Sequence, residues 1–168
     1  MSENASLCLR CAQHMRTCCQ TREIYITLGD VGRIAALSDR QDFYEYRVPS
    51  DPSYLDQDDD PTWATCVLGS DGRRRVLKRL PDGDCLFLGR RGCRLPLDVR
   101  PLICRLYPYE YNEQGIQEEL ASGCPVHLLP PGQRLVAVLQ MNLQDARRWH
   151  EQLYREVRLE RKPQCTLV

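Results

Sequence analysis

Residues 82–111 read DGDCLFLGRRGCRLPLDVRPLICRLYPYEY, and this turn-rich stretch holds Cys85, Cys93 and Cys104. Cys124 follows shortly afterwards in the segment SGCP. Structural zinc sites and iron–sulfur clusters are both built from sets of four cysteine thiolates. The spacing of these cysteines therefore predicts metal binding through thiolate ligands.

A second group of cysteines lies near the N-terminus. Cys8 and Cys11 are separated by two residues, and six residues later comes the doublet Cys18-Cys19. A C-x2-C pair suits a metal because its two thiolates can converge on one ion from a tight turn. Neighbouring side chains in extended backbone point to opposite faces, so the doublet can serve two different metals or irons. Eight of the ten cysteines thus predict one cluster with additional ligands, or two sites.

The composition is that of one globular domain, which we expect to span residues 1–168. Basic and acidic side chains balance at 23 each, so no net field draws the chain to nucleic acid or to a membrane. The N-terminus lacks the features of a secretory signal, and no apolar run approaches the roughly 20 residues that cross a bilayer. We therefore expect a cytoplasmic protein without membrane or nucleic-acid partners. Cytosolic thiols are kept reduced, which favours metal ligation over disulfides.

Helix signals follow the first cysteine group. Thr27 and Asp30 form a capping pair that predicts a helix through Leu37. The same kind of signal at Ser38 predicts a second short helix that continues to Tyr46. Turn residues elsewhere separate short strand-like runs. The predicted antiparallel hairpins join residues 63–68 to 74–80 and residues 107–111 to 116–120.

A long amphipathic helix is predicted at about residues 134–161. Apolar side chains recur there at spacings of three and four, and neither glycine nor proline interrupts the segment. The fold class that follows is α+β. We expect a small metal-stabilised domain with short antiparallel strands, two short helices and this long C-terminal helix.

Three segments together resemble the CxxCxxCC family of cysteine-cluster proteins, which is assigned a zinc- or iron-chelating role. They are the C-x2-C…CC pattern, the segment ITLGDVGRIA at residues 26–35, and CLFL…GC…RPLICRLYP at residues 85–108. The resemblance covers about residues 8–124, and RPLICRLYP is its most specific part. It implies eight metal ligands: Cys8, Cys11, Cys18, Cys19, Cys85, Cys93, Cys104 and Cys124.

One departure from the family concerns the first cysteine group. The family usually has two residues before the doublet, whereas this chain has six. The correspondence is therefore weaker for Cys8 and Cys11 than for Cys18 and Cys19. The longer loop also brings His14 into the neighbourhood, although exposure is more typical of a loop histidine than ligation.

Basic residues surround the second cysteine group. Residues 73–105 contain ten basic and three acidic side chains, while residues 39–60 contain eight acidic and two basic ones. Guanidinium groups stabilise the negative charge of metal-bound thiolates. We therefore expect Arg100 and Arg105, which flank Cys104, to lie around the metal. The run from Arg73 to Arg75 is interpreted as a solvated face.

Other candidates are weaker. His127 follows Cys124-Pro125 and is expected to be exposed, as is His150 on the C-terminal helix. Cys66 and Cys165 fall outside the cysteine pattern, and we interpret them as a buried core residue and a tail thiol.

The predicted function is metal binding, with an iron–sulfur cluster of the [4Fe–4S] kind favoured and zinc as the other or an additional cofactor. Such a protein would serve electron transfer, sensing or metal handling together with a protein partner. Two alternatives stay open. Flagellin lysine methylases resemble this family, which implies an S-adenosylmethionine-linked protein methylase. A purely structural zinc-binding interaction domain is the other.

Overall fold

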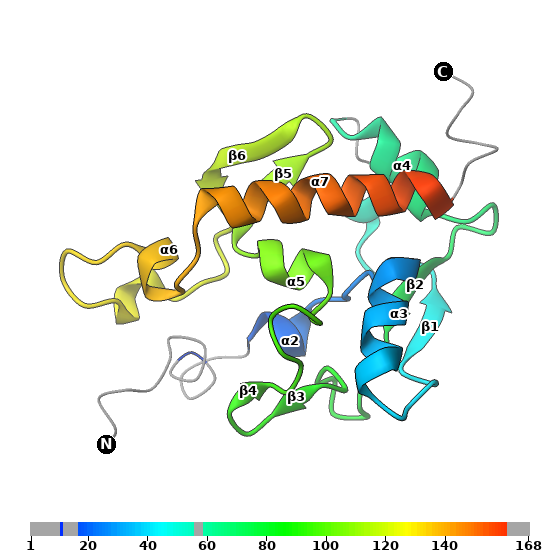
Figure 1. Cartoon of the computed structure of the whole chain (residues 1–168), viewed down its shortest axis with the longest axis horizontal. Helices are drawn as coiled ribbons and strands as arrows, with labels where there is room; N and C mark the ends of the chain where they lie inside the picture. The colour runs from blue at the N-terminus through cyan, green and yellow to red at the C-terminus, as the bar shows by residue number, and fades with distance from the viewer. Residues whose placement is uncertain (1–10, 12–16, 56–58, 161–168) are drawn as a thin grey trace.

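The capping pair at Thr27 begins helix α3 (Leu28–Leu37), as the sequence predicts. The Asp30 N–H donates to Thr27 Oγ1 at 2.9 Å, and the Thr27 N–H donates to the Asp30 carboxylate at 3.1 Å. The structure, a computed structural model of the 168-residue chain, describes residue 11 and residues 17–55 and 59–160. Figure 1 shows α3 beside a small sheet, with the long helix α7 crossing above it.

The predicted α+β class is confirmed, because short helices alternate with short antiparallel strands. The helices are α2 (Cys18–Thr21), α3, α4 (Pro61–Val67), α5 (Leu102–Leu106), α6 (Leu135–Val138) and α7 (Leu143–Glu160), with 3-10 turns η1 (Pro52–Leu55) and η2 (Val126–Leu128). The strands are β1 (Tyr44–Arg47), β2 (Arg74–Leu77), β3 (Leu88–Gly89), β4 (Gly92–Cys93), β5 (Tyr109–Asn112) and β6 (Gly115–Leu120).

The described strands form three separate two-stranded sheets, β1–β2, β3–β4 and β5–β6. The hairpin predicted between residues 107 and 120 is present, with Asn112 paired to Gly115 and Tyr109 paired to Leu120. The β3–β4 hairpin pairs Leu88 with Cys93, which fixes one cysteine of the second group on a tight turn.

Two predicted elements are wrong. Residues 63–67 belong to helix α4 instead of a strand, because the Asp60 carboxylate accepts the Trp63 N–H at 2.9 Å and Pro61 occupies the first turn. The second short helix at residues 38–46 is absent. The Ser38 backbone is extended, with φ −107° and ψ 136°, and so ends α3, and the residues that follow extend into β1 beside β2.

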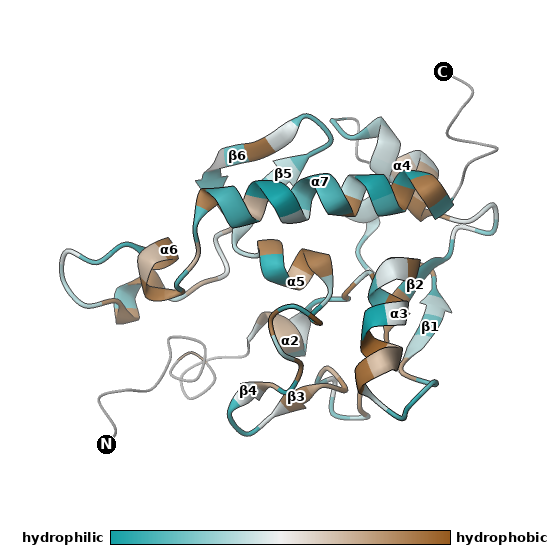
Figure 2. Ribbon diagram, in the orientation of Figure 1, coloured by the Kyte–Doolittle hydropathy of each residue, from teal (hydrophilic) through white to brown (hydrophobic). Residues whose placement is uncertain are grey.

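The C-terminal segment is helical, as predicted, but it is broken. Helix α6 ends at Val138, and Gln140 takes a left-handed conformation with φ 55°. Helix α7 then restarts, because Asn142 Oδ1 accepts the Asp145 N–H at 2.8 Å and so caps the new first turn. The apolar residues keep their helical spacing across the break, so the sequence pattern does not reveal it. Figure 2 shows the hydrophilic side of α7 turned away from the protein core.

The buried apolar side chains form two clusters. The first lies under α7 and comprises Tyr25, Trp63, Cys66, Val67, Leu102, Leu106, Ala146, Leu153, Tyr154 and Val157. The second lies under α3 and comprises Ile24, Ile26, Ile34, Phe43, Leu77, Cys85, Leu86, Phe87 and Leu95. Ile103 of α5 packs against both clusters. The burial of Cys66 in the first cluster confirms its predicted place in the core.

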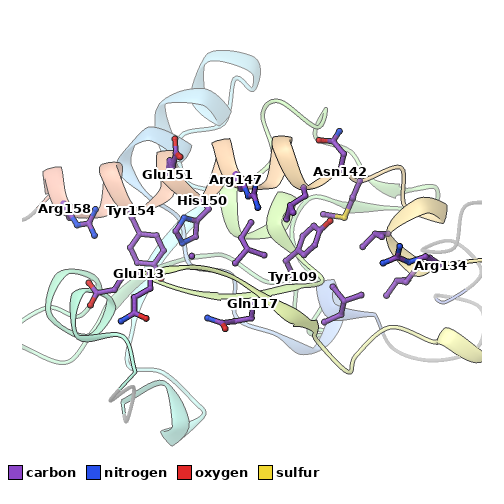
Figure 3. A pocket seen from close by; sticks show the side chains of 18 residues that line it. Tyr109, Glu113, Gln117, Arg134, Asn142, Arg147, His150, Glu151, Tyr154 and Arg158 are labelled. Atoms are coloured by element: carbon purple, nitrogen blue, oxygen red, sulfur yellow. The ribbon is translucent and has the colours of Figure 1, made fainter.

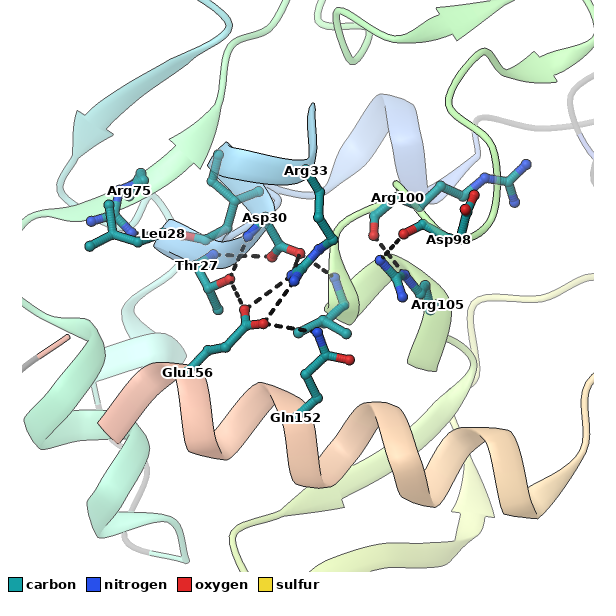
Figure 4. Close-up of polar contacts among 12 residues, drawn as sticks. Thr27, Leu28, Asp30, Arg33, Arg75, Asp98, Arg100, Arg105, Gln152 and Glu156 are labelled. Atoms are coloured by element: carbon teal, nitrogen blue, oxygen red, sulfur yellow. Dashed lines mark hydrogen bonds and ion pairs between the residues drawn. The ribbon is translucent and has the colours of Figure 1, made fainter. Parts of the chain in front are cut away.

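A buried polar network joins α3, α5 and α7 (Figure 4). The fully buried Asp30 carboxylate accepts from Arg33 at 2.7 Å and from the Leu102 N–H, in the first turn of α5, at 3.2 Å. Arg33 also donates to Glu156 of α7 at 2.8 Å. A Cβ added at Gly29 would lie 2.3 Å from the Glu156 carboxylate, so a larger residue there would have to displace that carboxylate.

The arginine run at residues 73–75 contradicts its interpretation as a solvated face. Only Arg73 is exposed, whereas Arg74 and Arg75 are buried. Arg74 pairs with Glu23 at 3.0 Å and lies 4.2 Å from the Tyr54 ring centroid, and Arg75 pairs with Glu160 at 3.0 Å. Strand β2 is covered on both edges, by β1 and by a bridge from Tyr25 to Val76. The aliphatic stems of both arginines are therefore enclosed.

None of the helices in the described ranges is long and apolar enough to cross a membrane.

Arg74 and Arg73 provide a matched pair of variants. We expect Arg74→Ala to lower the free energy of unfolding by about 2–4 kcal/mol, because it leaves the half-buried Glu23 carboxylate without its cation. Arg73→Ala should change the free energy by less than about 0.5 kcal/mol, since its side chain is exposed. Urea unfolding of the two variants measures the difference, and equal effects would contradict the burial of Arg74.

The Glu156 ion pair predicts a pH dependence of stability. Burial opposes it, but hydrogen bonds from Arg33, Thr27 and Gln152 lower the pKa of Glu156 below its ordinary value of 4.5. As the pH falls below that value, the Glu156 carboxyl binds more protons in the unfolded chain than in the folded protein. The stability that the ion pair contributes is therefore lost on acidification. Glu156→Gln should flatten the acid side of the stability curve between about pH 5 and pH 3. The measurement is the urea midpoint of both proteins across this range.

The buried Asp30 carboxyl also contributes to that comparison. Burial raises its pKa, so its contribution to acid stability has the opposite sign. The charge of Glu156 adds to this rise, so the difference between the two curves reports on both carboxyls. Parallel curves would show that Glu156 does not titrate with a lowered pKa.

Candidate metal centre

The described cysteines of the pattern lie in six separate places along the chain. Cys18 and Cys19 lie in α2, whose first turn is closed by a hydrogen bond from the Thr17 N–H to Gln20 Oε1 at 2.9 Å. The other described members are the buried Cys11, Cys85 after β2, Cys93 in β4, Cys104 in α5 and Cys124 before η2. Cys8 and His14 lie outside the described residues.

Backbone hydrogen bonds tie the N-terminal doublet to the second cysteine group. The Cys85 N–H donates to Cys19 O at 2.8 Å. Arg79 donates from Nη1 to Cys19 O at 3.1 Å and to Gly83 O at 2.6 Å, so one guanidinium holds both cysteine loops. The sequence predicts the two groups but not this contact, because it joins residues about sixty positions apart in the chain.

A hydrogen bond joins the two thiols of the doublet. A hydrogen bond from the Cys19 thiol lowers the pKa of Cys18 to about 7, although burial opposes the shift. The same hydrogen bond and burial raise the pKa of Cys19, and the neighbouring Cys18, Cys104 and Cys85 raise it further. Cys18 is therefore the thiol of this pair that ionises first, and Arg22 favours its thiolate.

The other thiols also lie near one another, with Cys11 and Cys85 buried and Cys104 half-buried. Burial raises the pKa of Cys104 well above its ordinary value, and the proximity of Cys85, Cys93 and Cys18 adds to the shift. Burial also raises the pKa of Cys85, with a further contribution from Cys93. The pKa of Cys11 is raised by burial and then by Cys18. Thiols from both cysteine groups thus lie close enough to disfavour one another's ionisation.

Tyr107 connects Cys124 to the rest of the group. Burial raises the pKa of the Tyr107 hydroxyl, and Cys124 and Cys18 raise it further through their proximity and through a hydrogen bond with Cys124. Arg22 lies 5.7 Å from the centroid of the Tyr107 ring. A Cβ at Gly123 would lie 2.3 Å from the Tyr107 hydroxyl, so the glycine before Cys124 makes room for it.

The thiol cluster, defined as the seven described cysteines of the pattern, fits a multivalent cation chemically. None of the seven forms a disulfide. Buried thiols that raise one another's pKa stay protonated until a cation replaces their protons, and a coordinating metal ion deprotonates thiols outright. Within the part of the chain that the structure describes, however, no three His, Cys, Asp or Glu donors stand close enough to hold one ion as placed. The thiols are gathered without being a preformed ligand set.

Arg100 and Arg105 lie beside the cysteine loops, and their hydrogen bonds go to the backbone. Arg100 Nε donates to Leu95 O at 2.9 Å. The buried Arg105 donates to Arg100 O at 2.8 Å and to Asp98 O at 2.6 Å. These contacts fix the turn that leads into α5 and Cys104. The predicted role of both arginines around a metal stays a prediction.

The two described histidines differ from each other. His127 is exposed in η2, as the sequence predicts. His150 is buried, which corrects its predicted place on the surface, and its Nε2 donates to Asn112 O at 2.7 Å. The cause is the β5–β6 hairpin, which packs against α7 and covers this side of the helix (Figure 3).

Buried thiols that converge from several segments define a cysteine-cluster domain of the metal-chelating class. The chain belongs to the CxxCxxCC family, described as "Putative zinc- or iron-chelating domain", and residues 7–125 match it. The matched range encloses all eight cysteines of the pattern and most of the chain, while α6 and α7 lie beyond it. No curated protein and no solved structure matches the chain.

Variants at Cys104 and Leu153 distinguish the loss of metal from the loss of stability. Cys104→Ser should lower the metal-to-protein ratio by roughly half if two four-thiolate sites are filled, and wholly if there is one. Leu153→Ala removes a fully buried side chain and should destabilise by about 2–5 kcal/mol while the folded protein keeps its metal. Elemental analysis and urea unfolding measure the two quantities. Full metal content in the Cys104 variant would exclude this thiol as a ligand.

Proposed function

We propose that the chain is a cytoplasmic module that holds an iron–sulfur cluster of the [4Fe–4S] kind through four of its eight patterned cysteines, with the other four available for a second site. The observation that carries this proposal is the convergence of buried and half-buried thiols from both cysteine groups, which raise one another's pKa. Cys8 completes the ligand set by its place in the family pattern. Family membership supports chelation of zinc or iron.

Thiol crowding supports a highly charged inorganic group. Several thiolates cannot share a buried region unless cations compensate their charges, since each ionised sulfur disfavours the next. The doublet Cys18-Cys19 contributes two sulfurs from adjacent residues, which suits a group with more than one metal atom. The iron–sulfur cluster would supply reversible electron uptake, and the chain's own residues would bind the cluster and exclude water from it.

Cationic side chains around the cysteine loops would balance the remaining negative charge. The described segment 73–105 has an excess of basic residues. Arg79, Arg94 and Arg105 donate to carbonyls of the cysteine-bearing loops, which holds their positive charges close to the sulfurs. Positive charge and hydrogen bonds near a cluster tune its reduction potential. This arrangement supports a role in electron transfer, sensing or metal handling.

Zinc is the second candidate, because the described cluster contains enough thiols for a closed four-sulfur site and zinc accepts such sites. In that case the metal stabilises the fold, and the protein acts as an interaction domain. Since the described thiols are not preformed as a ligand set, binding of either metal would be coupled to local ordering.

Elemental analysis with an absorption spectrum of protein purified without oxygen tests the proposal. Iron with acid-labile sulfide and a broad absorption near roughly 400 nm is the expected result for a thiolate-bound cluster. Colourless protein with about one or two zinc ions per chain would replace the cluster by structural zinc. Protein that folds with neither metal would contradict chelation by the thiol cluster.

A further inference from the structure

A groove of about 1410 Å³ runs between the β5–β6 hairpin and the α6–α7 segment (Figure 3). Pockets for small molecules usually enclose about 300–1,000 Å³. This groove is larger and partly open to solvent. Its volume therefore suits a stretch of extended chain better than a compact ligand.

Strand β6 presents an unpaired edge to the groove. In the described part of the chain it pairs only with β5, so its other edge keeps backbone N–H and C=O groups available. Ile116 and Gln117, whose side chains point to opposite faces of the strand, both line the groove. The groove therefore follows the edge of β6. Such an edge accepts a further strand from another chain.

The walls of the groove carry unsatisfied positive charge. Arg134, Arg147 and Arg158 line it, all three are exposed, and none forms an ion pair with any described residue. Two glutamates, Glu113 and Glu151, also line the groove, so three arginines against two carboxylates leave an excess of one positive charge. The balance favours an anionic occupant.

Apolar surface accompanies this charge. Leu143 at the start of α7 and Leu120 at the end of β6 both line the groove, and their side chains are 43% and 36% exposed. A strand in the groove would point alternate side chains to opposite sides. Alternating apolar and acidic residues would then meet the leucines and the arginines.

We propose that this groove binds an extended acidic segment of a partner protein, whose backbone pairs with β6 and whose carboxylates face the three arginines. The thiol cluster contributes no residue to the groove, so the interaction does not depend on the identity of the metal. The proposal gives a place and a chemistry to the protein partner expected from the sequence.

The probe is a fluorescein-labelled octapeptide of alternating glutamate and valine, and fluorescence anisotropy measures its binding to the full chain. Arg147→Glu should weaken binding by about tenfold, since it reverses one facing charge. The control is Arg155→Glu, an exposed position on α7 outside the groove, which should change binding by less than about twofold. N-methylation of alternate peptide bonds should abolish binding by removing the donors that pair with β6.

Metal content and thermal unfolding of both variants should equal those of the unaltered chain. Loss of peptide binding at the groove is then distinguishable from loss of metal binding by the thiol cluster. Three results would overturn the proposal. These are no binding by the unaltered chain, equal weakening by both variants, or equally tight binding of a lysine–valine peptide or a single-stranded oligonucleotide. A concentration-dependent dimer that Arg147→Glu dissociates would assign the groove to a second copy instead.

Discussion

The closeness of buried and half-buried thiols, whose ionised forms would repel one another, is the constraint on which the structure depends. Cys19, Cys85 and Cys104 come from three segments, yet Cys85 and Cys104 both raise the pKa of Cys19, and Cys85 raises that of Cys104. Such a group is stable either with all its protons or with a cation that replaces them. Much of the second apolar cluster packs around these residues, so the metal chemistry and the fold share the same side chains.

The helix beyond the family range connects to this region through buried charge. Asp30 accepts a hydrogen bond from the first turn of α5, which carries Cys104, and Arg33 joins Asp30 to Glu156 of α7. The network is fully buried at Asp30, where a broken contact leaves a charge without compensation. Helix α7 therefore stabilises the position of α5, and on its other flank it forms one wall of the groove beside β6.

The sequence predicts the helices and strands that are fixed by contacts between residues close together in the chain. The Thr27–Asp30 cap and the β5–β6 hairpin carry their own turn and capping residues, and both are present. Strand β1 and the buried Arg74 depend on pairing with distant segments, which periodicity does not reveal. The break before α7 depends on a single capping contact from Asn142 within an unbroken apolar pattern.

The candidate metal site is likewise predictable from the sequence only in part. Cysteine spacing predicts which thiols belong together, and residues 7–125 match the chelating family. Cysteine spacing does not predict that Tyr107 lies beside Cys124 or that Arg79 contacts both cysteine-bearing loops, because each contact requires the folded backbone. Which thiols share an ion depends on side-chain positions that the bound metal itself determines.

X-ray absorption at the metal edge, on protein purified without oxygen, tests thiolate ligation most directly. We expect a first shell made only of sulfur, at about 2.3 Å and with about four neighbours per metal. A first shell dominated by nitrogen or oxygen would contradict ligation by the thiol cluster.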